Sequence, residues 1–204
     1  MKIAILVEGE TEKAFRDSLR YFLESRLAQR MPKLQFVPQK GRLPKQEKLK
    51  RVVEDLFIGK NAVDAVIALT DVYTGTDDFV DAKDAKEKMK AWVGNHAKFY
   101  PHVAPYDFEA WLLPFWSTIQ ELAGHNKSAP KGQPEQVNHN KPPSEHIKEI
   151  FESGSKRRSY SKTRDGKRIL EKNKDNLMIS VQACPELKAF INTILTLCEG
   201  ELIP

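Results

Sequence analysis

The sequence contains little cysteine, and this scarcity excludes two common ways of stabilising a fold. Cys184 and Cys198 are the only cysteines, and they form no Cys-x-x-Cys pair. The histidines also lack the spacing of zinc ligands. We therefore expect neither a disulfide framework nor structural zinc, which fits a reducing cytosol.

Long hydrophobic runs and nucleotide-binding loops are absent too. The apolar run from Met1 to Val7 is too short for the hydrophobic region of a signal peptide, and Glu8 follows it at once. No later run is long enough to cross a bilayer. No Gly-x-x-x-x-Gly-Lys-Ser/Thr loop is present, so any nucleotide hydrolysis is expected to come from a partner. These absences predict a cytoplasmic, unanchored protein with no ATPase site of its own.

The residues that are present are typical of a folded, basic protein. The 204 residues are 40% hydrophobic and 30% charged, which is ordinary for a globular domain. The net charge of +5 and the pI of about 9.1 favour an anionic partner, because a basic surface attracts phosphate groups. We expect one compact core with an appendage.

An alternation of strands and helices marks residues 1–107 as an α/β core. The apolar run Ile3–Val7 is continuous, as in strands buried on both faces of a parallel sheet, and Thr11 is placed to cap the helix after it. Three further strands are predicted at residues 34–37, 65–69 and 100–106, with amphipathic helices between them. This order predicts a parallel sheet of about four strands with helices on both faces.

The strand pattern stops after residue 107. Helices are then predicted at residues 108–122, 144–151 and 185–198. Residues 108–204 are therefore expected to form a mainly helical C-terminal elaboration that packs on the core.

Acidic residues follow three of the predicted strands. Glu8 ends the first strand, Asp71 follows the third, and Asp107 and Glu109 follow the fourth. Ligands of parallel sheets bind where the carboxyl ends of strands converge, so these acids are expected at one edge. Mg²⁺ or Mn²⁺ needs oxygen ligands of this kind, and such a metal supports phosphodiester chemistry. The alternative is that each acid is a loop residue or a helix-start charge.

Two more acids lie near the first strand. Glu10 and Glu12 are both explained as charges at the start of a helix, and Glu12 is the stronger candidate for a catalytic role. Glu8 is the candidate for proton transfer, if burial and its acidic neighbours raise its pKa.

Five segments together carry a family resemblance. They are Leu6–Glu12, Thr70–Tyr73, Phe108–Leu113, Tyr160–Lys162 and Cys184–Pro185. The first resembles the opening motif of Toprim domains, especially those of overcoming-lysogenization-defect nucleases. The whole set resembles the Toprim-like family called domain of unknown function 4276, over nearly the full chain.

The resemblance implies functional roles for two of the acids. At a third position this sequence differs from the usual Toprim pattern. The resemblance implies acid–base or metal chemistry at Glu8 and a metal-binding acid at Asp71. Toprim enzymes usually carry a second acid two residues after the latter, where this sequence has Tyr73. The substitutes that we consider are Asp77, Asp78, Asp107 and Glu109. The resemblance also implies an ATPase partner and a role in bacterial anti-phage defence.

A basic segment lies within the predicted helical region. From Lys156 to Lys174 the segment contains nine basic residues and only two acidic ones, Asp165 and Glu171, which gives a local net charge of +7. Such a segment attracts phosphate backbones, and Tyr160 within it is suited to stacking on a base. Lys162 is a catalytic candidate because its ammonium could neutralise a scissile phosphate. The alternative is a solvated surface of ordinary charged residues.

Three functional hypotheses follow from these observations. The first is a Mg²⁺- or Mn²⁺-dependent endonuclease or related phosphodiesterase acting on DNA or RNA. The second, motivated by Tyr73, is a nucleic-acid-binding or regulatory subunit that has lost catalysis. The third is a receiver-like signalling domain, since receivers also carry acids after the first and third strands. The sequence leaves open whether the chain forms a homo-oligomer.

Overall fold

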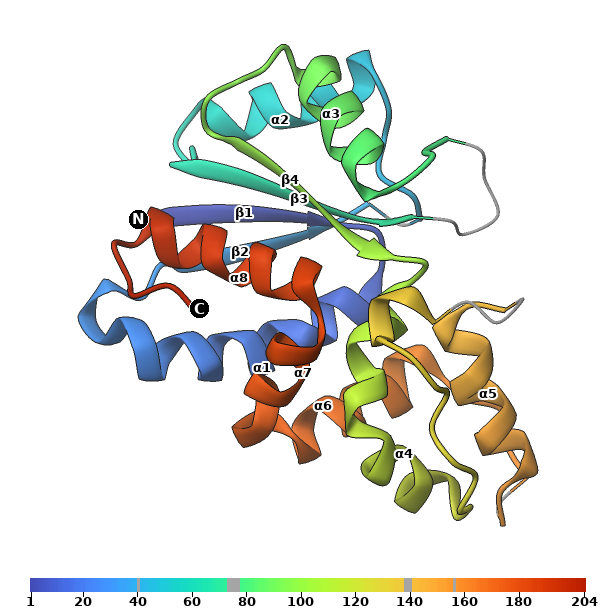
Figure 1. Ribbon diagram of the computed structural model, residues 1–204. Helices are drawn as coiled ribbons and strands as arrows, with labels where there is room; N and C mark the ends of the chain where they lie inside the picture. The colour runs from blue at the N-terminus through green and yellow to red at the C-terminus, as the bar shows by residue number, and fades with distance from the viewer. Residues whose placement is uncertain (40, 73–77, 138–140, 156) are drawn as a thin grey trace.

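The computed structural model describes residues 1–39, 41–72, 78–137, 141–155 and 157–204, and residues 10–13 by their backbone alone. Four parallel strands form one sheet in the order β2-β1-β3-β4 (Figure 1). The strands are β1 (Lys2–Val7), β2 (Lys33–Pro38), β3 (Ala65–Val72) and β4 (Phe99–Pro105). The predicted four-stranded parallel sheet is therefore confirmed.

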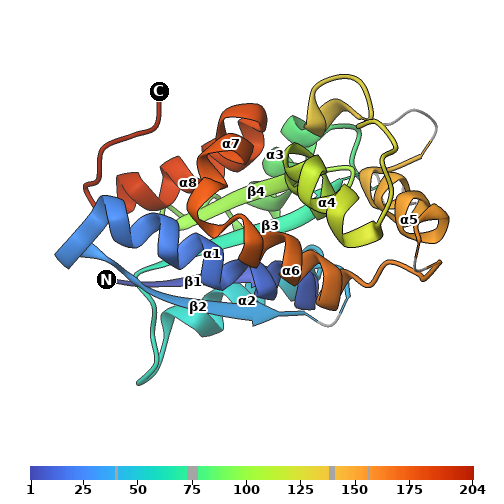
Figure 2. The ribbon, with the colours of Figure 1, turned by 90° about the horizontal axis from the view of Figure 1, so that it is seen from below.

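Helices cover both faces of the sheet, as the uninterrupted apolar run of β1 predicts. Ile3, Ile5 and Val7 point into a cluster shared with α1 (Glu10–Leu27) and α8 (Pro185–Leu197). Figure 2 shows these two helices lying across the sheet. The residues between them in sequence point to the opposite face, so the strand has no polar side.

The opposite face is covered by α2 (Glu47–Phe57) and α3 (Ala82–Val93). Asp81 caps the start of α3, because its side chain accepts a hydrogen bond of 2.7 Å from the N–H of Asp84. The helix ends at Gly94, which has a φ of 80° and closes it in the left-handed conformation that glycine tolerates. Helix α3 also lines the pocket described below.

The C-terminal part is mainly helical, as predicted. Its further elements are η2 (Phe108–Phe115), α4 (Trp116–Ala123), η3 (Pro134–Gln136), α5 (Pro143–Ser153), η4 (Lys162–Gly166), α6 (Lys167–Lys172), η5 (Lys174–Asn176) and α7 (Leu177–Ala183), and a short η1 (Ala28–Arg30) follows α1. Trp111 packs on Phe15 of α1, with ring centroids 6.0 Å apart, and on Phe108 at 5.4 Å. This part therefore shares one apolar cluster with the sheet. The domain boundary after residue 107 stays a prediction.

A buried glutamate, Glu135, connects Trp111 of η2 to the start of α8. The Glu135 carboxylate accepts hydrogen bonds from the N–H groups of Glu186 (2.9 Å) and Leu187 (3.2 Å). It also accepts one from Trp111 Nε1 at 2.8 Å. The carboxylate thus satisfies unpaired donors at a helix N-terminus, which a local cap residue usually does.

Three predicted boundaries were wrong. The third strand does not stop at residue 69 but continues to Val72, because Thr70, Asp71 and Val72 pair with Val103, Ala104 and Pro105 of β4. The first helix begins at Glu10, so Thr11 lies inside it and is not its cap.

The helix predicted at residues 108–122 is also divided. A 3₁₀-helix ends at Phe115, whose ψ of 34° is not helical, and α4 begins at the next residue. Pro114 lies at the division and has no N–H to continue a helix. Among all helices of the described residues, none is long and apolar enough to span a membrane.

Candidate functional site

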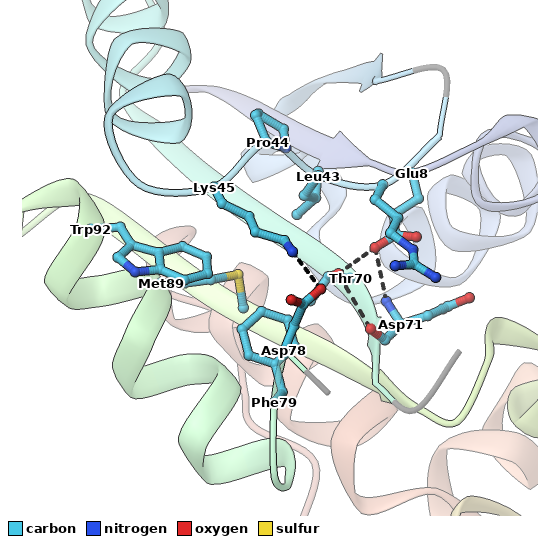
Figure 3. A pocket seen from close by; sticks show the side chains of 11 residues that line it. Glu8, Leu43, Pro44, Lys45, Thr70, Asp71, Asp78, Phe79, Met89 and Trp92 are labelled. Carbon is cyan, nitrogen blue, oxygen red and sulfur yellow. Dashed lines mark hydrogen bonds and ion pairs between the residues drawn. The ribbon is translucent and has the colours of Figure 1, made fainter. Parts of the chain in front are cut away.

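Glu8 and Asp71 are neighbours at the carboxyl edge of the sheet, where the Glu8 carboxylate contacts the backbone of Asp71 and the Asp71 side chain points away from it (Figure 3). Strands β1 and β3 are neighbours with Val7 opposite Leu69, which brings Glu8 beside Thr70. Thr70 Oγ1 donates a hydrogen bond to Glu8 Oε1. The Asp71 N–H donates to the same oxygen at 3.3 Å. Two acids that are 63 residues apart are thus brought together by the strand order.

The environment of Glu8 alters its protonation. Burial raises the pKa of the Glu8 carboxyl above its ordinary value of 4.5. Hydrogen bonds from Thr70 and the backbone, and the positive charge of Arg42, limit this rise. A bound cation would favour the carboxylate further, so protonation and metal binding would compete at this side chain.

A pocket adjoins the two acids. Its lining consists of three acidic residues, two cationic residues, one threonine and an apolar wall: Glu8, Asp71, Asp78, Arg42, Lys45, Thr70, Leu43, Pro44, Phe79, Met89 and Trp92. Lys45 and Asp78 form an ion pair of 2.5 Å across it (Figure 3). The cations come from the segment between β2 and α2, which the sequence did not single out.

Asp107 and Glu109 follow β4 and are almost completely buried. Their exposures are 1% and 0%. The N–H of Ser144 donates to Asp107 Oδ2 at 3.1 Å, whereas Oδ1 has no hydrogen-bond partner among the described residues. Burial and the nearby Glu109 charge raise the pKa of Asp107 to about 7. This acid pair is therefore shielded from bulk solvent, and a positive charge nearby is needed to stabilise its ionised form.

Lys162 supplies positive charge to that pair. Its Nζ donates to Glu109 Oε2 at 3.0 Å, and the Tyr160 hydroxyl donates to Oε1 at 3.3 Å. Burial alone would lower the pKa of Lys162, but the charges of Glu109, Asp107 and Asp71 outweigh it and raise that pKa. Lys162 therefore stays charged and interacts electrostatically with acids from both β3 and the segment after β4.

A second buried acid fixes the segment that carries Lys162. Asp165 is completely buried and accepts two hydrogen bonds from Arg158, of 2.6 and 2.8 Å. It also accepts from the Ser161 N–H at 2.9 Å and from Arg164 at 3.0 Å. Two guanidinium groups of the basic segment are thus engaged within the protein. The sequence offered one signal for this role, an aspartate surrounded by basic residues.

The remaining predicted residues lie elsewhere or outside the described structure. The side chain of Glu12 and the whole of Tyr73 and Asp77 are outside the described residues. Tyr160 contacts Phe151 at a centroid distance of 5.5 Å, and its suitability for stacking on a base stays a prediction. Its hydroxyl is engaged with buried Glu109, as described above.

His102 does not belong to this edge. It lies within β4, where its Nε2 is 2.9 Å from Thr193 Oγ1 of α8. Burial, with the charges of Lys86 and Lys90, lowers the pKa of His102 to about 3. The imidazole is therefore neutral and forms part of the contact between the sheet and α8.

The donor set at the edge fits one hard cation rather than a complete protein cage. Among the described residues, no group of three or more His, Cys, Asp or Glu side chains is arranged to hold a metal ion. Mg²⁺ commonly binds one or two carboxylates and keeps several waters and substrate oxygens. Glu8 and Asp71 supply carboxylates in that number from two neighbouring strands.

Comparisons with known proteins place the chain in a family. The C-terminal region of the Xanthomonas campestris pv. campestris OLD protein is 13% identical, with a TM-score of 0.44 over 96% of this chain and 96% of that chain. The C-terminal region of the Burkholderia pseudomallei OLD protein is 14% identical, with a TM-score of 0.42 over 93% and 98%. A comparison with curated proteins gives no match. Residues 7–195 match the family model described as Domain of unknown function (DUF4276). The chain therefore belongs to the DUF4276 family.

Proposed function

We propose that this protein is a Toprim-type, metal-dependent phosphodiesterase or endonuclease acting on DNA or RNA. The observation that carries the proposal is that Glu8 and Asp71 are neighbours at the carboxyl edge and line one pocket there. The charge of Asp71 also helps to raise the pKa of Lys162. The Toprim-like motif Leu6–Glu12 supports the proposal. The predicted roles of Glu12, and of Asp107 and Glu109 as metal ligands, stay predictions.

Each residue at the edge has a distinct part in this chemistry. A Mg²⁺ or Mn²⁺ ion, when bound, would supply charge stabilisation for the transferring phosphoryl group. Glu8 and Asp71 would hold it, and Thr70 would orient the Glu8 carboxylate. Lys162 is half exposed, so its ammonium can also reach a phosphate oxygen.

We further propose that the protein acts with an ATPase partner in anti-phage defence. The support is the resemblance of the motifs to the overcoming-lysogenization-defect nucleases, together with the lack of a phosphate-binding loop in this sequence. The basic segment is suited to nucleic acid, although Arg158 and Arg164 are already bound to Asp165.

The test is cleavage of mixed DNA and RNA substrates with Mg²⁺ or Mn²⁺, with and without a candidate ATPase partner. Glu8→Gln and Asp71→Asn are expected to abolish cleavage by the folded protein. Glu54→Gln, on the exposed surface of α2, is the matched control and should cut as the wild type does. Cleavage that survives in both site variants would refute the proposed roles.

The second candidate is a binding or regulatory subunit without catalysis. Tyr73 favours it, because an acid is usual at that position in Toprim enzymes. Calorimetric titration with Mg²⁺ and Mn²⁺ separates the two candidates. If neither the free nor the nucleic-acid-bound protein takes up metal, the binding role is the better account.

A further inference from the structure

We propose that the Lys162 ammonium takes the place of a second divalent cation at the acidic edge. The chain would then bind a single metal ion, at Glu8 and Asp71, and keep its own fixed cation beside Asp107 and Glu109. The inference rests on the proposed metal site. It adds a statement about the number of metal ions, which the proposed function leaves open.

The surroundings of Glu109 are those of a cation site that is already filled. Its carboxylate is completely buried, and its two oxygens accept from Tyr160 and Lys162. A buried carboxylate needs a compensating positive charge, which a metal or a protein cation can supply. Here the compensating charge is an ammonium at 3.0 Å.

Asp107 contributes a carboxylate oxygen that has no hydrogen-bond partner among the described residues. This oxygen, Oδ1, is buried, and the Lys162 charge acts on it without a direct bond. Together with Glu109, Asp107 forms a set of hard oxygen donors. If Lys162 were removed, this set would be left without its cation and could accept a divalent ion.

Contacts of buried Asp165 fix the segment that carries Lys162. Asp165 accepts from Ser161 N–H and binds the Arg158 guanidinium through both of its oxygens, which fixes the residues on either side of Lys162. A lysine that merely covered a surface would need no such support. The negative charge of Asp71 contributes to the raised pKa of Lys162, after the larger contributions of Glu109 and Asp107.

The chemical consequence concerns the second role in two-metal phosphoryl transfer. There, a second cation stabilises an oxygen on the far side of the reacting phosphorus. An ammonium provides three donors and a unit charge without depending on metal concentration. The absence of an acid at Tyr73 agrees with this, because a site with one metal needs fewer acidic ligands.

The experiment counts Mn²⁺ ions per chain by equilibrium dialysis and electron paramagnetic resonance, with and without nucleic acid. Wild type is expected to bind one ion. Lys162→Met is expected to bind two, because Asp107 and Glu109 lose their cation, whereas Lys162→Arg should bind one. Adding Glu109→Gln to Lys162→Met should return the count to one.

Wild type that binds two ions would overturn the inference and leave the proposed metal chemistry intact. A folded Lys162→Met variant that still binds one ion would also overturn it. Wild type that binds none, free or with nucleic acid, would refute the proposed function itself. If Lys162→Met is too unstable to titrate, its melting temperature provides the second readout and is expected to rise more with Mn²⁺ than that of wild type.

Discussion

Lys162 Nζ lies 3.0 Å from Glu109 Oε2, although 53 residues separate the two in sequence. Glu109 is completely buried and the lysine side chain is half exposed. The pair therefore connects the interior of the helical part with the open edge of the sheet. The predictions below test the residues that surround this pair and the neighbouring acids.

Thr70 is expected to tune Glu8 through its hydroxyl. The hydrogen bond from Thr70 lowers the pKa of Glu8 against the effect of burial, so Thr70→Val should raise that pKa. Metal binding requires the carboxylate, so the variant should need a higher pH to bind Mn²⁺. We expect about 10-fold weaker binding near neutral pH, as is usual when a group that orients a ligand is lost. Thr70→Ser keeps the hydroxyl and should bind like wild type in titrations over a pH series.

Asp107 is expected to make stability fall as pH rises. Its pKa is about 7 in the folded protein against 3.8 ordinarily, so the folded state binds more protons than the unfolded state between these values. The free energy of unfolding should therefore decrease across this window, by at most about 1.4 kcal/mol per pH unit. Asp107→Asn cannot ionise and should flatten the curve. Urea unfolding at a series of pH values measures this, and an unchanged slope would contradict the assignment.

Asp165 is expected to have the opposite pH dependence. Burial alone would raise its pKa, but hydrogen bonds from Arg158 and Arg164 lower it well below 3.8. Its contribution to stability is therefore complete above that value and is lost as the pH falls toward the folded-state pKa. Asp165→Asn should cost about 3 kcal/mol, because it leaves a largely buried guanidinium unpaired.

The matched control for Asp165 lies in the same segment. Glu171 is 57% exposed and pairs with Lys167 at 3.5 Å. Glu171→Gln should change the free energy of unfolding by less than about 0.5 kcal/mol. Thermal unfolding at neutral and acid pH compares the two variants. Equal effects would mean that Arg158 finds another partner.

Glu135 is expected to stabilise the packing of α8 on the rest of the protein. Glu135→Gln replaces one acceptor oxygen by an NH₂ group that faces a backbone N–H, either of Glu186 or of Leu187. We expect a loss of about 1–3 kcal/mol in urea unfolding, since a buried donor is left unpaired. Glu152→Gln, at an exposed position on α5, is the control and should have no measurable effect. A neutral result at Glu135 would contradict this role of its carboxylate.

The sheet was predictable because its signal is local. The apolar run of β1 serves two clusters, with Ile3 and Ile5 on one face and Ala4 and Leu6 on the other, and this requires an unbroken run. The end of β3 was not predictable in this way. Asp71 lies inside the strand because it pairs with β4, and a polar residue gives no local sign of such pairing.

The candidate site was predictable only in outline. The rule that ligands bind at the carboxyl ends of parallel strands placed Glu8 and Asp71 together. Lys162 was singled out from the basic segment, but the role of Thr70 in orienting Glu8 was missed, because that contact spans 62 residues of chain. No local pattern of residues reports such contacts.

The position of Asp71 within β3 limits the motion of its backbone. Residues opposite it and on both sides belong to the same ladder, from Thr70 to Val72 against Val103 to Pro105. Its backbone can therefore move only when neighbouring strands separate. The Asp71 amide itself donates to the Glu8 carboxylate, so its hydrogen exchange should report that contact and be faster than exchange at the centre of the sheet.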